Sequence, residues 1–391
     1  MRRCIRSAAL LAATILASTA VMAMPASAAP KDVGAADSGS TCAGLSTPPL
    51  PGVDTPRAAY DWQGAWQSRE VYIPSRGTGS CLFATVFAPA EPGKERLPAV
   101  VIVPAGLSTQ NEFQWAARDL AGHGYVAITI DPQGVGRSDL LAHPACRDGL
   151  PNCGDLDNLF PESVLGSQTA RVDAVRSGLD YLASPANPFA RRVDSRRMGA
   201  AGHSLGGSAV SSAQEVDRRI RAIVAWDMLF ARRYPALTLD PCKTLLNLAA
   251  RDVSPRAPAM SLNSDGGRPF CLTGDPEYQR WAGFEPWRAA GVASMLVPIR
   301  NAEHMDFAQQ AGPGQIDLGL PATGSEAELK VFAYYTRAWF DRYLAGDSSA
   351  TDRLVAPRVD GRPRDQVVST WLPSAAYLPQ DGIDCPGLSR C

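Results

Sequence analysis

The chain of 391 residues carries 38 lysine and arginine residues against 39 aspartate and glutamate residues, a formal charge of −1 at pH 7. This balance gives no electrostatic reason to expect a nucleic-acid partner, and we expect a neutral or small substrate instead. A chain of this length can bury one large core or two smaller ones.

The first 29 residues have the pattern of a secretory signal. Positive charge at Arg2, Arg3 and Arg6 precedes an apolar run over 8–21, and small residues follow at 26–28. The uncharged run is shorter than the roughly 20 residues that a spanning helix needs. We therefore expect a secreted, extracellular protein without stable membrane insertion.

The cysteines predict disulfides. Loss of the signal removes Cys4 and leaves eight cysteines, an even number, which favours disulfide pairing in an exported chain. Short loops close most easily, which favours Cys146 with Cys153 and Cys385 with Cys391. Elimination then pairs Cys42 with Cys81 and Cys242 with Cys271. Neither a Cys-x-x-Cys nor a His-Glu-x-x-His spacing occurs, so we expect no metal and no cofactor.

Strand and helix patterns alternate along the chain after a leader rich in Gly, Ser, Pro and Thr. The runs that predict strands are 68–74, 81–89, 99–103, 125–130, 198–201, 220–226, 259–263 and 293–299. Those that predict helices are 112–121, 168–182, 208–215 and 326–344. The first two strands suit an antiparallel pair at a sheet edge, and the continuous aliphatic runs suit strands covered on both faces.

This alternation predicts an α/β fold with a mostly parallel central sheet and helices on both faces. In such a sheet, sites form at the carboxyl ends of the strands. The expected organisation is a signal peptide over 1–29, a flexible leader over 30–59, an ordered domain over 60–345 and an irregular C-terminal strap over 346–391. The chain contains no internal repeat.

The pentapeptide Gly202-His203-Ser204-Leu205-Gly206 predicts a nucleophilic serine. In a Gly-x-Ser-x-Gly turn the serine occupies a strained strand-to-helix bend, and small flanking residues let the backbones pack closely. Here an apolar strand precedes the motif and a helix follows it, as the mechanism requires. An ordinary turn serine is the alternative.

His304 is the candidate base, because it is the one histidine that follows the pentapeptide. It comes just after the strand predicted at 293–299, where a loop can carry it over Ser204; a surface histidine is the alternative. Two carboxylates can orient its imidazole. Asp227 ends the strand at 220–226, and Asp265 follows the strand at 259–263.

Two backbone amides are candidates for an oxyanion hole. The N–H of Leu205 lies at the start of the helix after Ser204, where helices leave donors unpaired. The loop after the strand at 99–103 offers a second donor, for which the N–H of Leu107 is the candidate. A plain glycine turn at Gly106 is the alternative for this loop.

With these residues placed, the chain resembles the α/β-hydrolases. Residues 68–344 resemble the bacterial cutinases and polyester hydrolases, most clearly over 119–131 and 193–207. That branch implies Asp265 as the acid, although its acid normally falls about two positions further on, at Gly267. The platelet-activating-factor acetylhydrolases are similar in 105–107 and 202–207, and they imply Asp227, which we favour.

The resemblance also marks departures. The usual histidine before the oxyanion glycine is Ala105, and the aromatic residue of polyester hydrolases is replaced by Leu107, which argues against bulky aromatic polyesters. Trp226 is a candidate wall of the substrate pocket, with core packing as an equal alternative.

The resulting hypothesis is a secreted serine esterase of the lipase and cutinase type, acting as a monomer on a small or polymeric ester through an acyl-enzyme. A peptidase or amidase is the first alternative, because the same acyl chemistry cleaves amides. A catalytically silent binding module is the second, because a fold does not fix a function.

Overall fold

The computed structural model describes Cys42 and residues 60–91, 93, 95–106, 108–138, 161–233, 251–266, 280–309 and 323–385. The expected signal peptide, and the leader apart from Cys42, lie outside these residues. The strands of the central sheet are β1 (Trp66–Pro74), β2 (Cys81–Pro89), β3 (Leu97–Val103), β4 (Val126–Ile130), β5 (Val193–His203), β6 (Ile220–Trp226), β7 (Ala259–Ser264), β8 (Ser294–Ile299), β11 (Ala375–Leu378) and β12 (Ile383–Cys385).

The helices of the described residues lie between and after these strands. They are α2 (Gln114–Gly122), α4 (Pro161–Ala183), α5 (Leu205–Val216), α8 (Glu285–Ala289), α9 (Glu326–Phe340) and α10 (Ala350–Val355). Short 3₁₀ or π turns are η1 (Asp61–Gln63), η2 (Gln110–Phe113), η5 (Ala190–Arg192), η6 (Arg280–Phe284), η7 (His304–Phe307), η8 (Asp341–Ala345), η9 (Arg364–Gln366) and η10 (Pro379–Asp381). A small hairpin, β9 (Arg358–Val359) and β10 (Arg362–Pro363), stands apart from the central sheet.

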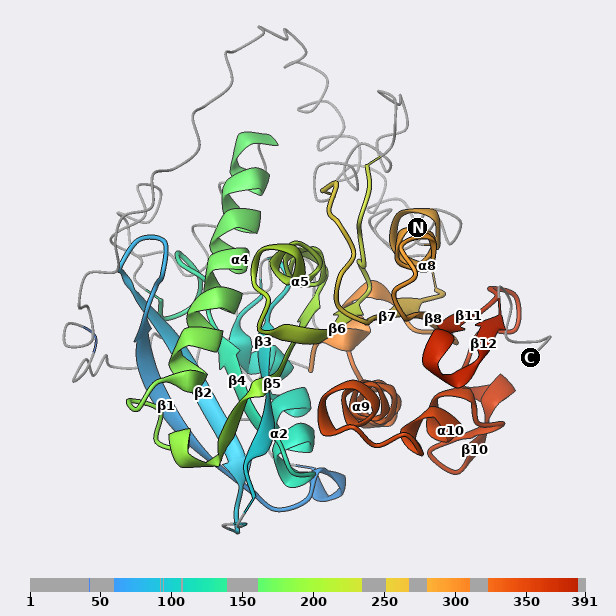
Figure 1. The fold of residues 1–391 in the computed structure, drawn as a ribbon, viewed down its shortest axis with the longest axis horizontal. Helices are drawn as coiled ribbons and strands as arrows, with labels where there is room; N and C mark the ends of the chain where they lie inside the picture. The colour runs from blue at the N-terminus through green and yellow to red at the C-terminus, as the bar shows by residue number, and fades with distance from the viewer. Residues whose placement is uncertain are drawn as a thin grey trace, which may run out of the picture. The chain divides into compact units, whose positions relative to one another are not determined.

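The central sheet has ten strands in the order β1-β2-β4-β3-β5-β6-β7-β8-β11-β12 (Figure 1). The strands from β4 to β8 in this order run parallel to their neighbours, whereas β1, β2, β11 and β12 pair antiparallel at the two edges. The sequence therefore predicted correctly a mostly parallel sheet with an antiparallel pair, β1 and β2, at one edge.

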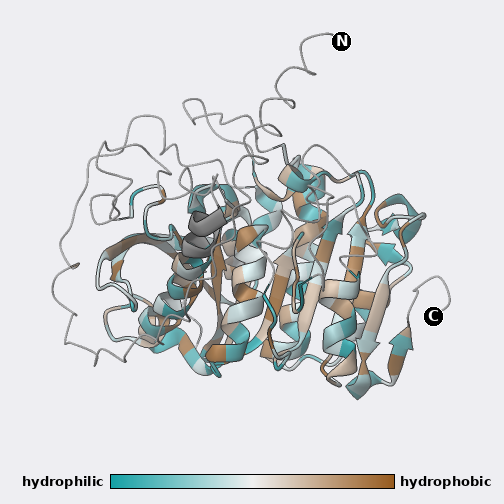
Figure 2. Cartoon of the chain, turned by 90° about the horizontal axis from the view of Figure 1, so that it is seen from above, coloured by the Kyte–Doolittle hydropathy of each residue, from teal (hydrophilic) through white to brown (hydrophobic). Residues whose placement is uncertain are grey.

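Helices cover both faces of this sheet and give it two hydrophobic cores. One core lies between the strands and the helices α2 and α9, and the other lies against α4 and α5 (Figure 1). The central strands are largely hydrophobic along their length (Figure 2). Val100 to Val103 in β3 are fully buried, which a parallel strand requires because both of its faces are covered.

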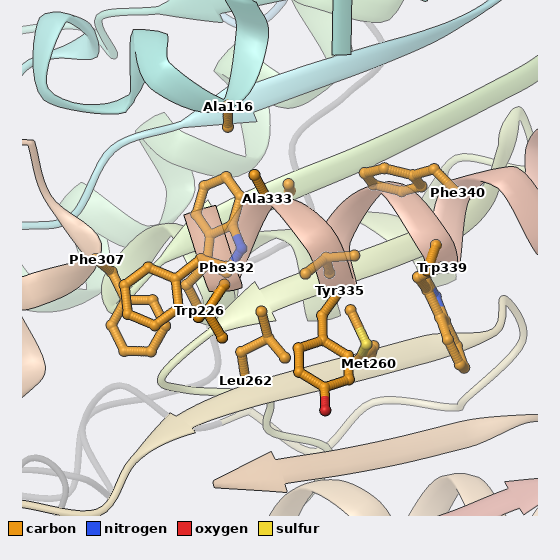
Figure 3. Close-up of a cluster of buried hydrophobic side chains, with 14 of the residues drawn as sticks. Ala116, Trp226, Met260, Leu262, Phe307, Phe332, Ala333, Tyr335, Trp339 and Phe340 are labelled. Atoms are coloured by element: carbon orange, nitrogen blue, oxygen red, sulfur yellow. The ribbon is translucent and has the colours of Figure 1, made fainter. Parts of the chain in front are cut away.

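Aromatic side chains of α9 fill the first core. Phe332, Tyr335 and Trp339 pack over β6 and β7, against residues such as Trp226 and Leu262 (Figure 3). The helix begins where the sequence places a capping box. The Oγ of Ser325 accepts the Glu328 N–H, and the Glu328 carboxylate accepts the Ser325 N–H at 2.8 Å.

The C-terminal segment corrects one prediction. Residues 346–391 were expected to form an irregular strap, but β11 pairs with β8 and β12 pairs with β11, so this segment extends the central sheet. Its described residues belong to the same compact unit as the rest of residues 39–391. The reason is the edge of β8, whose backbone groups need partners that residues 375–377 supply.

The expected disulfide between Cys42 and Cys81 is present. Cys385 is also disulfide-bonded, and Cys391, its expected partner, lies outside the described residues. The pairs predicted for Cys146 with Cys153 and for Cys242 with Cys271 lie outside the described residues. Within the described part of the chain, none of the helices combines the length and the apolar character that crossing a membrane takes.

Candidate active site

Ser204 lies on a sharp turn between β5 and α5. Its φ of 54° and ψ of −118° place a non-glycine residue in a strained region of backbone space. The turn is held because the Ser204 N–H donates to the carbonyl of Trp226 at 3.0 Å, across the neighbouring strand. Such a bend presents the serine side chain at the carboxyl end of the sheet, as the pentapeptide predicts.

The two glycines of the pentapeptide are required by close backbone contacts. A Cβ on Gly202 would lie 2.5 Å from the carbonyl group of Gly206. A Cβ on Gly206 would lie 2.5 Å from the carbonyl oxygen of Val103 and 2.6 Å from that of Pro104. Gly206 therefore keeps the start of α5 directly against the loop that follows β3.

We expect Gly206→Ala to lower the free energy of unfolding by about 1–3 kcal/mol, the usual scale of overpacking. Alanine would gain roughly 1 kcal/mol of helix propensity over glycine in α5. The overlap outweighs this gain, since the contacted atoms are backbone and cannot swing away. Urea denaturation measures the difference. Gly93→Ala is the control, because a Cβ there meets nothing within 4 Å; equal stability of the two variants would contradict the packing argument.

His304 and Asp227 form a buried pair. The Nδ1 of His304 lies 2.7 Å from the Oδ2 of Asp227, and both side chains are at least 95% buried. The hydroxyl of Ser264 donates to the same Oδ2 at 2.8 Å, and the Ser264 N–H donates to Oδ1 at 3.3 Å. With a proton on Nδ1, the carboxylate fixes the tautomer that leaves Nε2 free as a base.

Asp265, the alternative acid, has a different contact. Its Oδ1 accepts the N–H of Asn301 at 2.6 Å, and the N–H of Gly266 donates to the carbonyl of Ala302 at 2.8 Å. Asn301 has a left-handed φ of 60° between β8 and His304. Asp265 therefore holds the backbone of the loop that carries the histidine, and Asp227 contacts the imidazole itself.

The backbone after β6 is strained beside Ser204. Asp227 has a φ of 56° and Met228 a φ of 156°, two consecutive non-glycine residues with positive φ. Such strain persists only where the surrounding structure fixes it, and it is concentrated at functional sites. The hydroxyl of Ser204 donates to the Sδ of Met228 at 3.4 Å. The structure thus joins the Ser204 hydroxyl to Met228 and His304 to Asp227, and the described residues show no hydrogen bond between Ser204 and His304.

His203, which precedes Ser204, packs against His304. The two imidazole rings lie 4.6 Å apart between centroids, and Phe113 and Phe307 enclose the His203 ring at 5.6 and 5.5 Å. His203 is fully buried, and neither ring nitrogen has a hydrogen-bond partner among the described residues. Burial, together with the nearby His304, lowers the pKa of His203 well below its usual value.

This lowered pKa predicts acid sensitivity. Below pH 6.5 the unfolded chain protonates His203 while the folded protein keeps it neutral, so the free energy of unfolding falls as the pH falls. The contribution has a slope of up to about 1.4 kcal/mol per pH unit until the folded-state pKa is reached. We expect His203→Phe to flatten the dependence measured by urea denaturation from pH 6.5 downward. Identical slopes for variant and wild type would contradict this.

The other predicted site residues are the two oxyanion candidates, Leu205 and Leu107, and the pocket candidate Trp226. Leu205 is the first residue of α5, where a helix leaves its N–H groups without intrahelical partners. Leu107 lies outside the described residues. Trp226 is fully buried, its Nε1–H donates to the Thr336 hydroxyl at 3.0 Å, and its ring stacks on Phe113. These contacts are those of core packing, the second alternative for Trp226, and nothing in the structure tests the substrate-pocket expectation.

Arg171 and Met228 contribute to the candidate site but were not predicted from the sequence. Arg171, fully buried on α4, donates to the carbonyl of Ala105 at 2.7 Å and to that of Pro104 at 3.2 Å, which fixes the loop after β3. Met228 contacts the Ser204 hydroxyl. A lone arginine in a helix gives no signal in the sequence. Met228 could have been suspected, because it directly follows the candidate acid Asp227.

The chain is similar to known cutinases over part of its length. The chain is 27% identical over 124 residues to Cutinase 2 of Thermobifida cellulosilytica, covering 32% of this chain and 36% of that protein. It is 27% identical over 124 residues to Cutinase cut1 of Thermobifida fusca, covering 32% and 29%, and 25% identical over 124 residues to Cutinase est1 of Thermobifida alba, covering 32% and 31%. The chain thus spans about a third of the length of the curated relatives it matches.

No protein-family model matches the chain. The distant similarity to the cutinases supports an α/β-hydrolase-like relationship, and the mostly parallel sheet with helices on both faces agrees with it. The expected fold class is confirmed: this chain has an α/β-hydrolase fold.

Proposed function

We propose that this protein is a secreted serine ester hydrolase with Ser204, His304 and Asp227 as its triad. The Ser204 hydroxyl attacks the ester carbonyl while His304 takes its proton, and the alcohol leaves with that proton. Water, activated by the same imidazole, then cleaves the acyl-enzyme and releases the acid. The Asp227 carboxylate stays ionised and stabilises the imidazolium.

The single observation that supports this proposal best is the buried contact of 2.7 Å between His304 and Asp227 beside the strained turn of Ser204. A buried carboxylate with no further role is costly, since desolvation opposes its charge. Ser204, Asp227 and His304 follow the carboxyl ends of β5, β6 and β8. A nucleophile, a base and an orienting acid are the parts that acyl transfer requires.

Leu205 and Leu107 are the proposed oxyanion donors. The N–H of Leu205 points from the first turn of α5, where the helix dipole favours negative charge. Arg171 binds the carbonyls that precede residue 107, and Gly206 keeps α5 against the same loop. Both contacts fix the chain at residues 103–105, shortly before Leu107. Donors that are held in position usually stabilise the transition state more than any other group.

The substrate we propose is a small or polymeric ester without bulky aromatic groups. The cutinase names of the distant relatives favour ester over amide chemistry. Leu107 replaces the aromatic residue that the resemblance implies for polyester hydrolases, so an aromatic acyl group lacks its usual partner. Action as a monomer, without a cofactor or nucleic acid, completes the proposal. The disulfide between Cys42 and Cys81 fits an extracellular location.

The experiment that tests this proposal compares one acyl chain in two leaving-group contexts. Turnover of p-nitrophenyl butyrate and of the matching p-nitroanilide is measured on the full chain. An esterase cleaves the ester and leaves the anilide intact, whereas comparable cleavage of the anilide would identify the amidase alternative. Turnover of neither substrate would favour the silent binding module.

A further inference from the structure

We propose that Met228 is an oxidation-sensitive modification site that disables the nucleophile. The inference rests on the proposed function, because it assigns Ser204 as the reacting group. A peroxide is the class of co-reactant, and the sulfoxide of Met228 is the product.

The contact is the hydrogen bond from the Ser204 hydroxyl to the Sδ of Met228 at 3.4 Å. A thioether is a weak acceptor, so the resting hydroxyl gives up this bond readily when a base takes its proton. A methionine sulfur beside the nucleophile therefore costs the enzyme little. It also places a side chain that peroxide can oxidise next to the reacting atom.

The strained turn fixes the sulfur in place. Met228 has a φ of 156° directly after Asp227 at 56°, and its side chain is 99% buried. A Cβ on Gly207 would lie 3.1 Å from the Met228 carbonyl oxygen, so this backbone packs tightly on the first turn of α5. An altered Met228 side chain thus has little room to turn away from Ser204.

The chemistry of oxidation changes the acceptor. A hydroperoxide transfers one oxygen atom to the sulfur, its O–O bond breaks, the sulfur loses two electrons and the peroxide leaves as water or an alcohol. The product carries an S–O group, which is polar where the thioether is apolar. Its oxygen accepts the Ser204 hydrogen strongly and fills space beside the hydroxyl. The proton is then held away from His304.

Access follows from the proposed function. Ser204 is 6% exposed, and any route that brings an ester carbonyl to its hydroxyl also admits hydrogen peroxide, which is smaller. The described part of the chain holds four other methionines. Met198, Met260 and Met295 are fully buried in strands, and Met305, beside His304, is 8% exposed. Met305 is therefore the rival explanation for any loss of activity in peroxide.

The experiment treats the full chain with hydrogen peroxide and follows two readouts together. One is p-nitrophenyl ester turnover, and the other is the sulfoxide content of each methionine peptide by mass spectrometry. We expect turnover to fall as the Met228 sulfoxide forms, by about tenfold or more at complete oxidation, the factor that one added hydrogen bond on the resting hydroxyl is worth. Met228→Leu and Met305→Leu are treated in parallel, each compared with its own untreated rate.

We expect peroxide-treated Met228→Leu to retain its turnover. Met305→Leu should lose turnover to the same extent as the wild type. Loss in Met228→Leu at the wild-type rate, or full wild-type turnover with Met228 oxidised, would overturn the inference. A protein without ester turnover before treatment would contradict the proposed function instead. The peptide masses then still decide whether peroxide reaches Met228, and an unoxidised Met228 would overturn the inference on its own.

Discussion

Replacing Ser204 by alanine is expected to lower p-nitrophenyl ester turnover by about six powers of ten, the scale of nucleophile removal in serine hydrolases. The reason is that no acyl-enzyme can form without the hydroxyl, and background attack by water lacks an activated nucleophile. The variant loses one weak bond to the Met228 sulfur, so its urea denaturation midpoint should stay close to the wild-type value.

Ser212→Ala is the matched control for this variant. Ser212 lies in α5, the helix that follows Ser204. Its hydroxyl donates to the carbonyl of Ser208, one turn earlier in the same helix, at 3.2 Å. Its loss should leave ester turnover at the wild-type level. Wild-type turnover in Ser204→Ala would remove the proposed nucleophile, and equal loss in both variants would mean that α5 is damaged rather than the chemistry.

Asp227→Asn is expected to lower turnover by about four powers of ten, the effect of the same change in a serine protease triad. The amide removes the negative charge that stabilises the imidazolium. An amide N–H facing His304 also donates to Nδ1 and so favours the tautomer that lacks a free base at Nε2. Steady-state kinetics with the same ester measure this loss in kcat.

Asp265→Asn separates the two candidate acids. The asparagine keeps a carbonyl oxygen that can accept the Asn301 N–H, and the Oδ2 of Asp265 has no hydrogen-bond partner to lose among the described residues. We therefore expect this variant to retain most of the wild-type kcat. Near-normal activity of Asp227→Asn together with inactivity of Asp265→Asn would reverse the assignment.

Much of the fold could be predicted because the signals are local. Buried parallel strands such as 99–103 are continuous aliphatic runs, and the alternation of strands and helices along the chain predicts a mostly parallel sheet. The tail at 346–391 could not be predicted in the same way. The segment 375–378 is short and contains two alanines, so it gives no strand signal of its own. It becomes a strand because β8 offers an unpaired edge, and β8 is distant in the sequence.

Part of the candidate site could also be predicted from local sequence, and part depends on tertiary contacts. The turn of Ser204 follows from the pentapeptide, because only glycines fit the contacts of Gly202 and Gly206. The choice between Asp227 and Asp265 could not be derived from spacing, since both follow neighbouring strands and lie at the same rim. A single contact of 2.7 Å to His304 distinguishes them. The roles of Arg171 and Met228 likewise depend on tertiary contacts.

The most direct test of the proposed triad is the site at which a fluorophosphonate probe reacts, identified by peptide mass spectrometry on the full chain. Such probes phosphonylate an activated serine, so we expect one adduct on Ser204, greatly reduced in Asp227→Asn and close to normal in Asp265→Asn. An adduct on another serine, or no adduct on a protein that turns over esters, would contradict it.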